Sequence, residues 1–223
     1  MTVQSDLAAL RSVPLFSGLP PEGLDEIYRA AATRFYPAGS FLFHQDDPAG
    51  RFYVLVEGRV KLSQLSPDGQ QVLMRVATPG MMIAAIALVE GAVYPVSAQA
   101  GEDSRLLAWE QAGLLALIDR YPALARSALS VLAGHVREFQ DRYRELATER
   151  VERRLARTIL RLAGQTGRKT EAGVLLDLQI TRQDLAEMCG TTLFTVSRII
   201  SQWEAQGLVQ AGREQVIIRF PHG

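Results

Sequence analysis

The amino-acid sequence predicts an α+β protein in three parts: an N-terminal β-roll, a long central helix and a C-terminal winged helix-turn-helix. Short β-forming runs alternate with turn signals between residues 34 and 109. Apolar residues then recur in alternating steps of three and four between residues 123 and 148. Two helical segments meet at a glycine within residues 181–207. We therefore divide the chain into residues 1–118, 119–147 and 148–223.

The N-terminal part opens with helical patterns at Leu7–Leu10 and Glu22–Ala32 and then becomes rich in β-forming runs. Short strands at close, even spacing are typical of a small barrel or a double-layered roll. Alanine and methionine dominate Met81–Val89, so we expect a short helix there inside the roll. The β-forming runs cover residues 41–43, 52–56, 60–62, 71–76 and 106–109.

The central segment carries six apolar residues in heptad spacing, which predicts a long helix from about residue 123 to residue 148. Charged residues flank this stripe, as they do in a two-stranded coiled coil. We interpret the stripe as the contact with a second copy in a parallel dimer; packing against the helix's own domain is the alternative. The stripe consists of Leu129, Leu132, Val136, Phe139, Tyr143 and Leu146.

The C-terminal part contains two short helices with a sharp bend between them. Thr181 can cap the first helix, with Asp184 completing a variant capping box, and Gly190 supplies the bend. Either Thr191 or Thr192 can cap the second helix. Its apolar stripe comprises Val196, Ile199, Ile200 and Trp203, and this leaves another face made of Thr192, Leu193, Phe194, Ser197 and Arg198.

An ordinary helical hairpin is the alternative to a helix-turn-helix. The alternating strand at residues 215–220, with a turn around Gly212-Arg213 before it, favours a wing and therefore a winged helix-turn-helix. Such a domain places its second helix in the major groove of DNA, and two copies about one helical turn apart read a palindrome.

Charge is distributed unevenly along the chain. Lys and Arg together number 24, as do Asp and Glu, so the net charge is zero. Eleven basic and eight acidic residues follow residue 147, which leaves +3 in the C-terminal part and −3 before it. A mildly basic C-terminal part is compatible with DNA binding.

Several classes of protein are excluded by residues that the sequence lacks. The single cysteine, Cys189, cannot form an internal disulfide or a multi-cysteine metal or iron–sulfur site, and we expect it to be packed. The N-terminus lacks a signal-peptide pattern and the longest apolar run, at residues 81–89, is too short to span a bilayer, so we expect a cytoplasmic protein. Without a phosphate-binding glycine loop, a zinc-binding histidine pair or a nucleophile elbow, we do not expect an enzyme.

The order of these parts resembles the CRP/FNR family of bacterial transcription regulators over essentially the whole chain. The motifs in the roll are Pro37-x-Gly39 before Phe43, Phe52-Tyr53-Val54-Leu55, Gly58-x-Val60-Lys61 and Gly80. Those in the C-terminal part are Ile180-Thr181-Arg182-Gln183-Asp184-Leu185-Ala186, Gly190 and Thr195-Val196-Ser197-Arg198. The resemblance implies a cyclic-nucleotide-binding-like jelly roll, and partners that are palindromic double-stranded DNA, a second copy and RNA polymerase.

The resemblance also implies roles for residues of the C-terminal part. Ser197 and Arg198 face base edges, and Arg198 suits bidentate contact with guanine. Phe194 departs from the glutamate that is common at its position, and a phenylalanine packs on a thymine methyl, so the operator should differ there; local packing of Phe194 is the alternative. Thr192 and Leu193 share this face. The residues implied to contact phosphates are Thr181, Arg182, Gln183 and, at the wing, Arg213.

The sensor part departs from members that bind cyclic AMP. Their ribose-binding glutamate corresponds to Ala85, their phosphate-binding Arg-Ser pair to Tyr94-Pro95, and their adenine-contacting residues to Phe139 and Gln140. A buried phosphate needs an arginine or a nest of donors, so we do not expect cyclic AMP in the usual mode. The iron–sulfur cluster of the oxygen-sensing branch is not expected either, because its N-terminal cysteines are absent.

An apolar effector pocket is what remains, and its expected lining is Met81, Met82, Ile83, Ala85, Tyr94, Phe139 and Gln140. The run Gly190–Arg198 and the ending Ile218–His222 resemble the nitric-oxide-responsive branch, some members of which hold haem. Haem is therefore a candidate cofactor, with His44, His135, a methionine or a chain terminus as axial ligand. Alternatively, both histidines are ordinary surface or packing residues and the roll is a protein-interaction surface that needs no effector.

Overall fold

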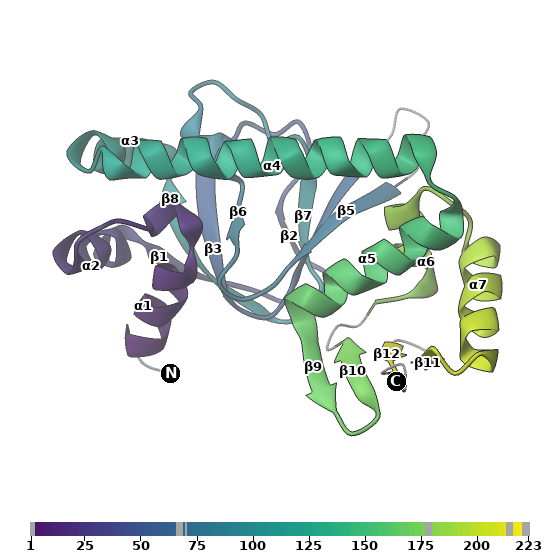
Figure 1. Ribbon diagram of the computed structural model, residues 1–223. Helices are drawn as coiled ribbons and strands as arrows, with labels where there is room; N and C mark the ends of the chain where they lie inside the picture. The colour runs from purple at the N-terminus through teal and green to yellow at the C-terminus, as the bar shows by residue number, and fades with distance from the viewer. Residues whose placement is uncertain (1–2, 66–68, 70, 177–179, 213–215, 220–223) are drawn as a thin grey trace. The chain divides into compact units, whose positions relative to one another are not determined.

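The structure is a computed structural model that describes residues 3–65, 69, 71–176, 180–212 and 216–219 (Figure 1). The chain divides into two compact units, Met1–Glu138 and Phe139–Gly223, and the boundary falls inside helix α4 (Ala123–Thr148). Our three-part division stays a prediction. The first unit also contains α1 (Val3–Ser12), η1 (Pro14–Phe16), α2 (Pro21–Ala30), β1 (Ala32–Tyr36), β2 (Phe41–Phe43), β3 (Arg51–Glu57), β4 (Val60–Leu65), β5 (Gln71–Ala77), β6 (Met82–Ile83), η2 (Ala85–Leu88), β7 (Ser97–Ala100), β8 (Ser104–Glu110) and α3 (Gln111–Arg120).

Two antiparallel four-stranded sheets form the roll, as the sequence predicts. One sheet has the strand order β1-β8-β3-β6 and the other has the order β2-β7-β4-β5. Tyr53 of β3 lies opposite Ala108 of β8, and Lys61 of β4 lies opposite Gln99 of β7. Each run that the sequence analysis identified falls within a strand, whereas β1, β6 and β7 were not predicted.

The segment Met81–Val89 is a strand followed by a 3-10 helix, which corrects the expectation of one short helix. Met82 and Ile83 form β6, and η2 begins at Ala85. Between them Ala84 has a φ of +64°, in the left-handed region that residues with a side chain rarely adopt. This one residue turns the chain from the sheet into η2.

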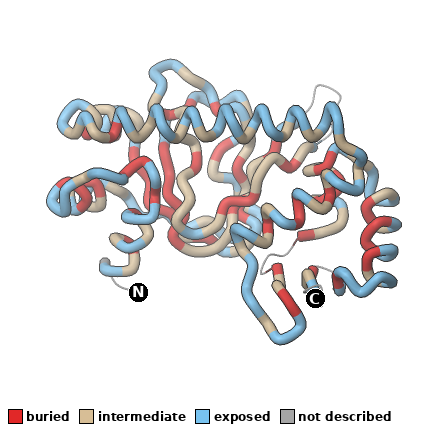
Figure 2. The backbone as a smooth tube through the Cα atoms, viewed as in Figure 1, coloured by how far each residue is buried: buried red, intermediate tan, exposed pale blue. Residues whose placement is uncertain are grey.

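The core of the roll is built around β3 and β8, where buried residues are continuous (Figure 2). Both faces of β3 are covered, and helices α1 and α3 pack against it. The Trp109 ring lies 5.9 Å from that of Phe16 and 5.6 Å from that of Phe52. Its indole Nε1 donates to the Ile27 carbonyl at 2.9 Å, so α2 is bonded directly to the core.

A buried ion network ties α1 to the roll. Arg105 of β8 donates to both carboxylate oxygens of Asp6, at 2.8 and 3.0 Å, and to Glu57 at 2.7 Å. The side chain of Arg105 is 11% exposed and that of Asp6 is 8% exposed, whereas that of Glu57 is 39% exposed. The bonds to Asp6 raise the pKa of Arg105, because they favour its charged form.

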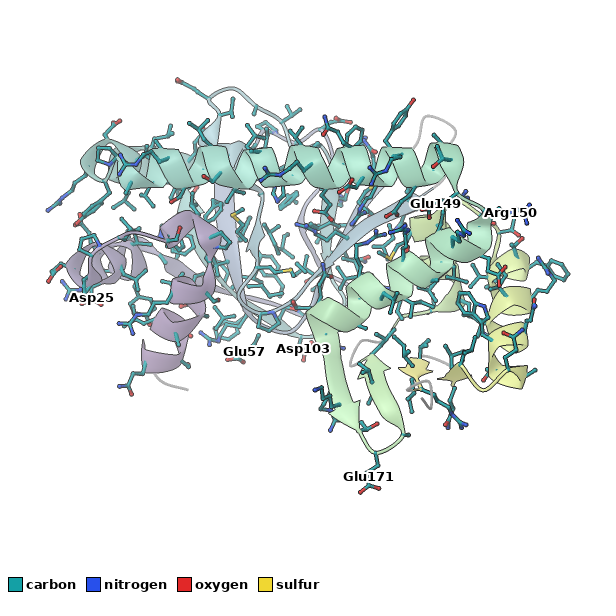
Figure 3. All side chains as sticks on the ribbon, in the orientation of Figure 1. Asp25, Glu57, Asp103, Glu149, Arg150 and Glu171 are labelled. Carbon is teal, nitrogen blue, oxygen red and sulfur yellow. The ribbon has the colours of Figure 1, made fainter. Side chains whose placement is uncertain are left out.

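After the end of α4, the described part of the second unit consists of helices α5, α6 and α7 and a four-stranded antiparallel sheet with the order β11-β12-β10-β9. The sequence analysis did not identify its first helix, α5, or the hairpin of β9 and β10, whose tip carries Glu171 (Figure 3). Both strands of the expected wing are present, but its turn residue Arg213 lies outside the described residues. The elements are α5 (Val151–Thr166), β9 (Gly167–Thr170), β10 (Gly173–Leu176), α6 (Arg182–Cys189), α7 (Leu193–Ala205), β11 (Val209–Ala211) and β12 (Val216–Ile218).

Within the described ranges, every helix is too short or too polar to cross a membrane.

The ion network predicts an asymmetry between its two buried partners. Arg105→Ala leaves the Asp6 carboxylate buried without a counter-ion and should lower the free energy of unfolding by about 3–5 kcal/mol. Asp6→Ala should lower it by only about 1–3 kcal/mol, because Arg105 keeps its bonds to Glu57. Urea denaturation followed by Trp109 fluorescence, in a Trp203→Phe background, measures both losses. Glu57→Gln is the exposed control, and equal losses for the two alanine variants would contradict the asymmetry.

Candidate nucleic-acid interface and effector site

The start of α6 is fixed by a reciprocal capping box. The backbone N–H of Asp184 donates to Thr181 Oγ1 at 3.0 Å, and the backbone N–H of Thr181 donates to Asp184 Oδ2 at 2.9 Å. This confirms the predicted box. Thr181 Oγ1 only accepts in this pair, so the pair does not use its hydroxyl hydrogen.

The turn between α6 and α7 depends on Gly190. Its φ of 59° and ψ of 51° lie in the left-handed region. The Thr191 N–H donates to the Ala186 carbonyl at 2.9 Å and the Gly190 N–H donates to the Glu187 carbonyl at 3.2 Å, which together form a Schellman motif. A Cβ at Gly190 would also meet Leu146 Cδ2 at 3.3 Å. The left-handed conformation therefore favours glycine, and a side chain there would also press on the flexible end of Leu146.

Helix α7 separates an apolar buried face from an exposed one. Thr192 is its cap, because Thr192 Oγ1 accepts from the Thr195 N–H at 3.2 Å, so the structure selects Thr192 over Thr191. Val196, Ile199, Ile200 and Trp203 are buried. On the other face Leu193 is 47% exposed and Phe194 is 77% exposed, so local packing does not account for Phe194. Arg198 is exposed and Ser197 is half-buried beside it.

The residues implied to contact phosphates lie at the first turn of α6. Thr181 and Arg182 are half-buried, and Gln183 is exposed with its side-chain amide donating to Glu187 at 3.1 Å. The structure therefore gathers Thr181, Arg182 and Gln183 on one helix start, where free N–H groups attract anions. Arg213 lies outside the described residues.

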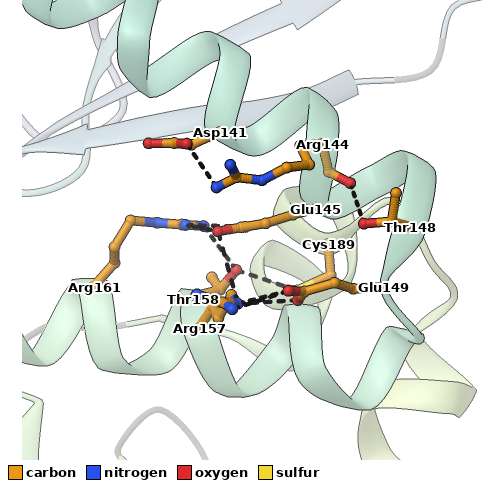
Figure 4. A network of polar contacts seen from close by, with 9 residues as sticks. All are labelled: Asp141, Arg144, Glu145, Thr148, Glu149, Arg157, Thr158, Arg161 and Cys189. Carbon is orange, nitrogen blue, oxygen red and sulfur yellow. Dashed lines mark hydrogen bonds and ion pairs between the residues drawn. The ribbon is translucent and has the colours of Figure 1, made fainter.

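A polar network, which the sequence analysis missed, joins the end of α4 to α5 (Figure 4). Arg161 Nη1 lies 3.2 Å from a carboxylate oxygen of Glu145, and Arg157 Nε donates to both oxygens of Glu149 at 3.0 Å. Glu149 stands in the short connection between the two helices (Figure 3). The ion pairs that join α5 to Glu145 and Glu149 lie eight, twelve and sixteen residues apart in sequence, and such spacings carry no helical signal.

Cys189 is joined to this network through Thr158. Its side chain is buried and its Sγ donates to Thr158 Oγ1 at 3.5 Å. Burial raises the pKa of the Cys189 thiol, with Thr158 and Arg154 opposing the shift, so the group is a thiol at neutral pH. The expected packing role of Cys189 is confirmed.

Tyr94 is part of the interior of the roll. It is 4% exposed and stacks on Phe43 with ring centroids 3.8 Å apart. Its hydroxyl donates to the Arg51 carbonyl at 3.0 Å and accepts from the Arg51 N–H at 2.9 Å. Burial raises the pKa of Tyr94, which keeps the phenol neutral. Both hydrogen-bonding capacities of this hydroxyl are therefore used by the protein itself.

The other predicted lining residues of the first unit lie around η2. Met81, Met82 and Ala85 are partly buried against the core, and Ile83 is buried within it. Gln111 holds the end of η2 by donating to the carbonyls of Ala87 and Val89 at 3.0 and 3.1 Å. Phe139 and Gln140 belong to the second unit and are exposed.

One charged contact joins the roll to the part of α4 in the first unit. Arg75 of β5 donates to Glu138 Oε2 at 2.5 Å, with both side chains about 30% exposed. Burial, followed by repulsion from Arg75, lowers the pKa of His135, and Glu138 opposes the shift. His135 therefore carries a neutral imidazole at neutral pH. The sequence analysis missed Arg75, which places a guanidinium beside α4.

His44 lies elsewhere on the roll. It is exposed at the turn after β2, and its ring lies 4.3 Å from that of Phe41. Both rings line a surface hollow of about 600 Å³ together with Gln45, Ser63 and Leu65. Among the described residues, no cluster of three or more His, Cys, Asp or Glu could hold a metal ion.

Comparison with known proteins agrees with this architecture. The family model of the cyclic nucleotide-binding domain matches residues 33–121, and that of the Crp-like helix-turn-helix domain matches residues 153–223. The cyclic AMP receptor protein of Thermus thermophilus is 31% identical over 210 residues, which cover 94% of each chain. The chain belongs to the CRP/FNR family. It is therefore a DNA-binding transcription regulator and not an enzyme.

Other members of the CRP/FNR family match most of the chain. The anaerobic regulatory protein of Bacillus subtilis is 24% identical over 207 residues, which cover 92% of this chain and 87% of that protein. The solved structure of CLP from Xanthomonas campestris superposes with a TM-score of 0.77 at 20% identity, and covers 91% of this chain and 100% of that one. The identity to CLP supports a shared fold only.

Proposed function

We propose that this protein is a cytoplasmic, homodimeric regulator that reads a palindromic operator with α7 and responds to a small effector bound by its roll. The observation that carries the proposal is the exposed face of α7. Phe194 and Arg198 are exposed and Ser197 is half-buried, on a helix whose cap, preceding turn and buried face are fixed by hydrogen bonds and packing. Within the described part of the second unit, Phe194 is left 77% exposed, and a DNA groove would cover it.

The exposed stripe of α4 supports a dimer. Within the first unit α4 faces the roll through a different stripe, in which Leu124 is buried and Ala128 packs on the core. Among the described residues the heptad positions stay largely exposed, with exposed fractions from 48% at Val136 to 67% at Leu129 and Tyr143. A second copy of α4 is the partner that this spacing fits, because alternating steps of three and four keep a seam in contact only with another helix.

DNA recognition divides between two groups of residues. Arg198 pairs with guanine, Ser197 bonds a neighbouring base edge and Phe194 packs on a thymine methyl. Thr192 and Leu193 line the same groove. Thr181, Arg182, Gln183 and Arg213 hold phosphates and set the register of α7 without reading sequence. RNA polymerase is the expected partner on the bound promoter.

The effector is not cyclic AMP bound in the usual mode, although the Thermus relative is named as its receptor. Ala85 offers only a methyl group where a carboxylate would hold the ribose. The Tyr94 hydroxyl is already hydrogen-bonded to the backbone of Arg51. Arg75 could meet an anion, but only by releasing Glu138. An effector works by binding one arrangement of the dimer more tightly than the other.

Haem is the candidate cofactor, and His135 suits it better than His44. A neutral imidazole is the form that binds iron, and the pKa of His135 is lowered. Met81 and Met82 pack against the core of the roll, and Ile83 is part of that core. Both histidines are exposed, and His44 lies at the turn after β2 against Phe41. Haem would supply the iron that binds nitric oxide.

A roll that needs no effector is the second candidate, favoured by the complete use of the Tyr94 hydroxyl inside the protein. In that case the roll is a protein-interaction surface, and the amount of protein sets the activity.

The base-reading proposal predicts how substitutions change the operator. Selection from a random DNA pool should enrich a palindrome with the wild-type protein. Arg198→Ala should weaken operator binding by about 1–3 kcal/mol, and Phe194→Glu should change the preferred base at one position of each half-site from thymine to cytosine. Fluorescence anisotropy with operators altered at single positions measures both effects. Failure of the wild type to enrich any palindrome would refute the proposal.

The dimer proposal predicts separation into monomers when the stripe is charged. Val136→Glu with Leu132→Glu places carboxylates in the seam and should convert the dimer to monomers in sedimentation velocity. Palindrome affinity should fall while the circular dichroism spectrum stays unchanged. Arg137→Glu, an exposed substitution outside the stripe, is the matched control. A wild type that sediments as a monomer at operator-binding concentrations would exclude the dimer.

The effector proposal predicts a Soret band when haem is supplied anaerobically to the purified protein, with a shift on adding nitric oxide. His135→Ala should abolish the band and His44→Ala should keep it. Calorimetric titration with cyclic AMP should show no binding. A wild type without a Soret band would support the roll that needs no effector.

A further inference from the structure

One arginine of α5 contacts the backbone at two separate places in the second unit. Arg154 Nη1 donates to the Glu149 carbonyl at 2.9 Å, in the connection after α4. Its Nε donates to the Cys189 carbonyl at 3.1 Å, and its Nη2 lies 3.5 Å from the Gly190 carbonyl. A single planar guanidinium therefore spans from the end of α4 to the turn of the helix-turn-helix.

We propose that Arg154 is a positioning residue for DNA recognition: it fixes the turn at Gly190 relative to the end of α4, and so sets the direction of the base-reading face of α7. This inference rests on the proposed reading of bases by α7. It assigns a role to a residue that itself touches no base.

The carbonyls that Arg154 binds are those that the turn leaves without partners. The Schellman motif satisfies Ala186 and Glu187, and the carbonyls that follow have no place in the helical ladder. Arg154 takes those of Cys189 and Gly190. Its positive charge also suits the negative ends of two helices, α6 and α4, at once. Arginine is needed because its donors form a rigid fork, whereas a lysine offers one ammonium point.

The connection from this contact to α7 is short. Only Thr191 and Thr192 separate the Gly190 carbonyl from Leu193, the first residue of α7. Thr191 is bonded back to Ala186, and Thr192 caps α7. Because both residues are held by these hydrogen bonds, a shift of the turn moves the start of α7, which carries Leu193 and Phe194.

Two other arginines of α5 are bonded to side chains of α4 and of the short connection between α4 and α5. Arg157 pairs with Glu149 and Arg161 with Glu145, and both hold α5 to the end of α4. These pairs give α5 a fixed place from which Arg154 reaches α6. The Thr158 hydroxyl, which meets Cys189 Sγ and Arg161 Nη2, supports the same junction.

Arg154→Lys is the decisive variant. Its matched control is Arg153→Lys, at the exposed residue just before it. Lysine keeps the charge, so affinity for scrambled DNA should stay within about twofold of the wild type, since counterion release depends on charge. Affinity for the selected operator should fall about tenfold or more in Arg154→Lys, which is roughly the effect of losing one charged hydrogen bond. Arg153→Lys should leave both affinities unchanged.

A merely structural role would lower the melting temperature and leave the ratio of operator to scrambled affinity unchanged, and that result would overturn the proposal. Equal loss of this ratio in Arg153→Lys would overturn it as well. Amide hydrogen exchange at Gly190 and Thr191 supplies a readout without DNA: it should accelerate in Arg154→Lys alone, and unchanged exchange there would count against the proposal. If the wild type enriches no DNA, base reading fails, while exchange still tests the restraint of the turn.

Discussion

Gly190 reverses the chain between α6 and α7 with a φ of 59°, and the rest of the second unit is arranged around that reversal. Leu146 Cδ2 lies 3.3 Å from where a Cβ at Gly190 would stand, so the end of α4 is close to the turn. Arg154 and Cys189 bring α5 to the same point. Three helices therefore meet at one glycine, and α7 leaves that meeting point in a fixed direction.

Helix α4 faces a different constraint, because it serves two surfaces along one axis. Leu124 and Ala128 belong to the core of the roll, and the heptad stripe lies outside it. An α-helix has about 3.6 residues per turn. The residues that face the roll and those of the heptad stripe therefore lie on different sides of α4. The polar residues between them, including Glu138, connect the helix to the roll.

Local signals in the sequence predicted much of this protein. Thr181 and Asp184 mark a helix start within four residues, and Gly190 marks its end, so the recognition motif needed no tertiary information. Short runs and turns also predicted strands β2, β3, β4, β5 and β8 of the roll, but not β1, β6 or β7. Ala84 was not, because only the structure reveals a left-handed alanine in a segment whose composition suggests a helix. The Asp6–Arg105 pair, the Arg75–Glu138 pair and the reach of Arg154 join residues far apart in sequence, where no periodic pattern exists.

The exposure of Phe194 has a consequence for how selectivity responds to salt. In the proposed complex with DNA, contacts from Arg182 and Arg198 would release counterions and so weaken as ionic strength rises. Contact between a phenyl ring and a thymine methyl releases none, and its hydrophobic gain does not weaken in the same way. We therefore expect base discrimination at the Phe194 position to persist at salt concentrations at which the overall affinity for DNA has fallen. As the ionic strength of its surroundings increases, such a regulator would lose affinity for DNA but keep its base discrimination at this position.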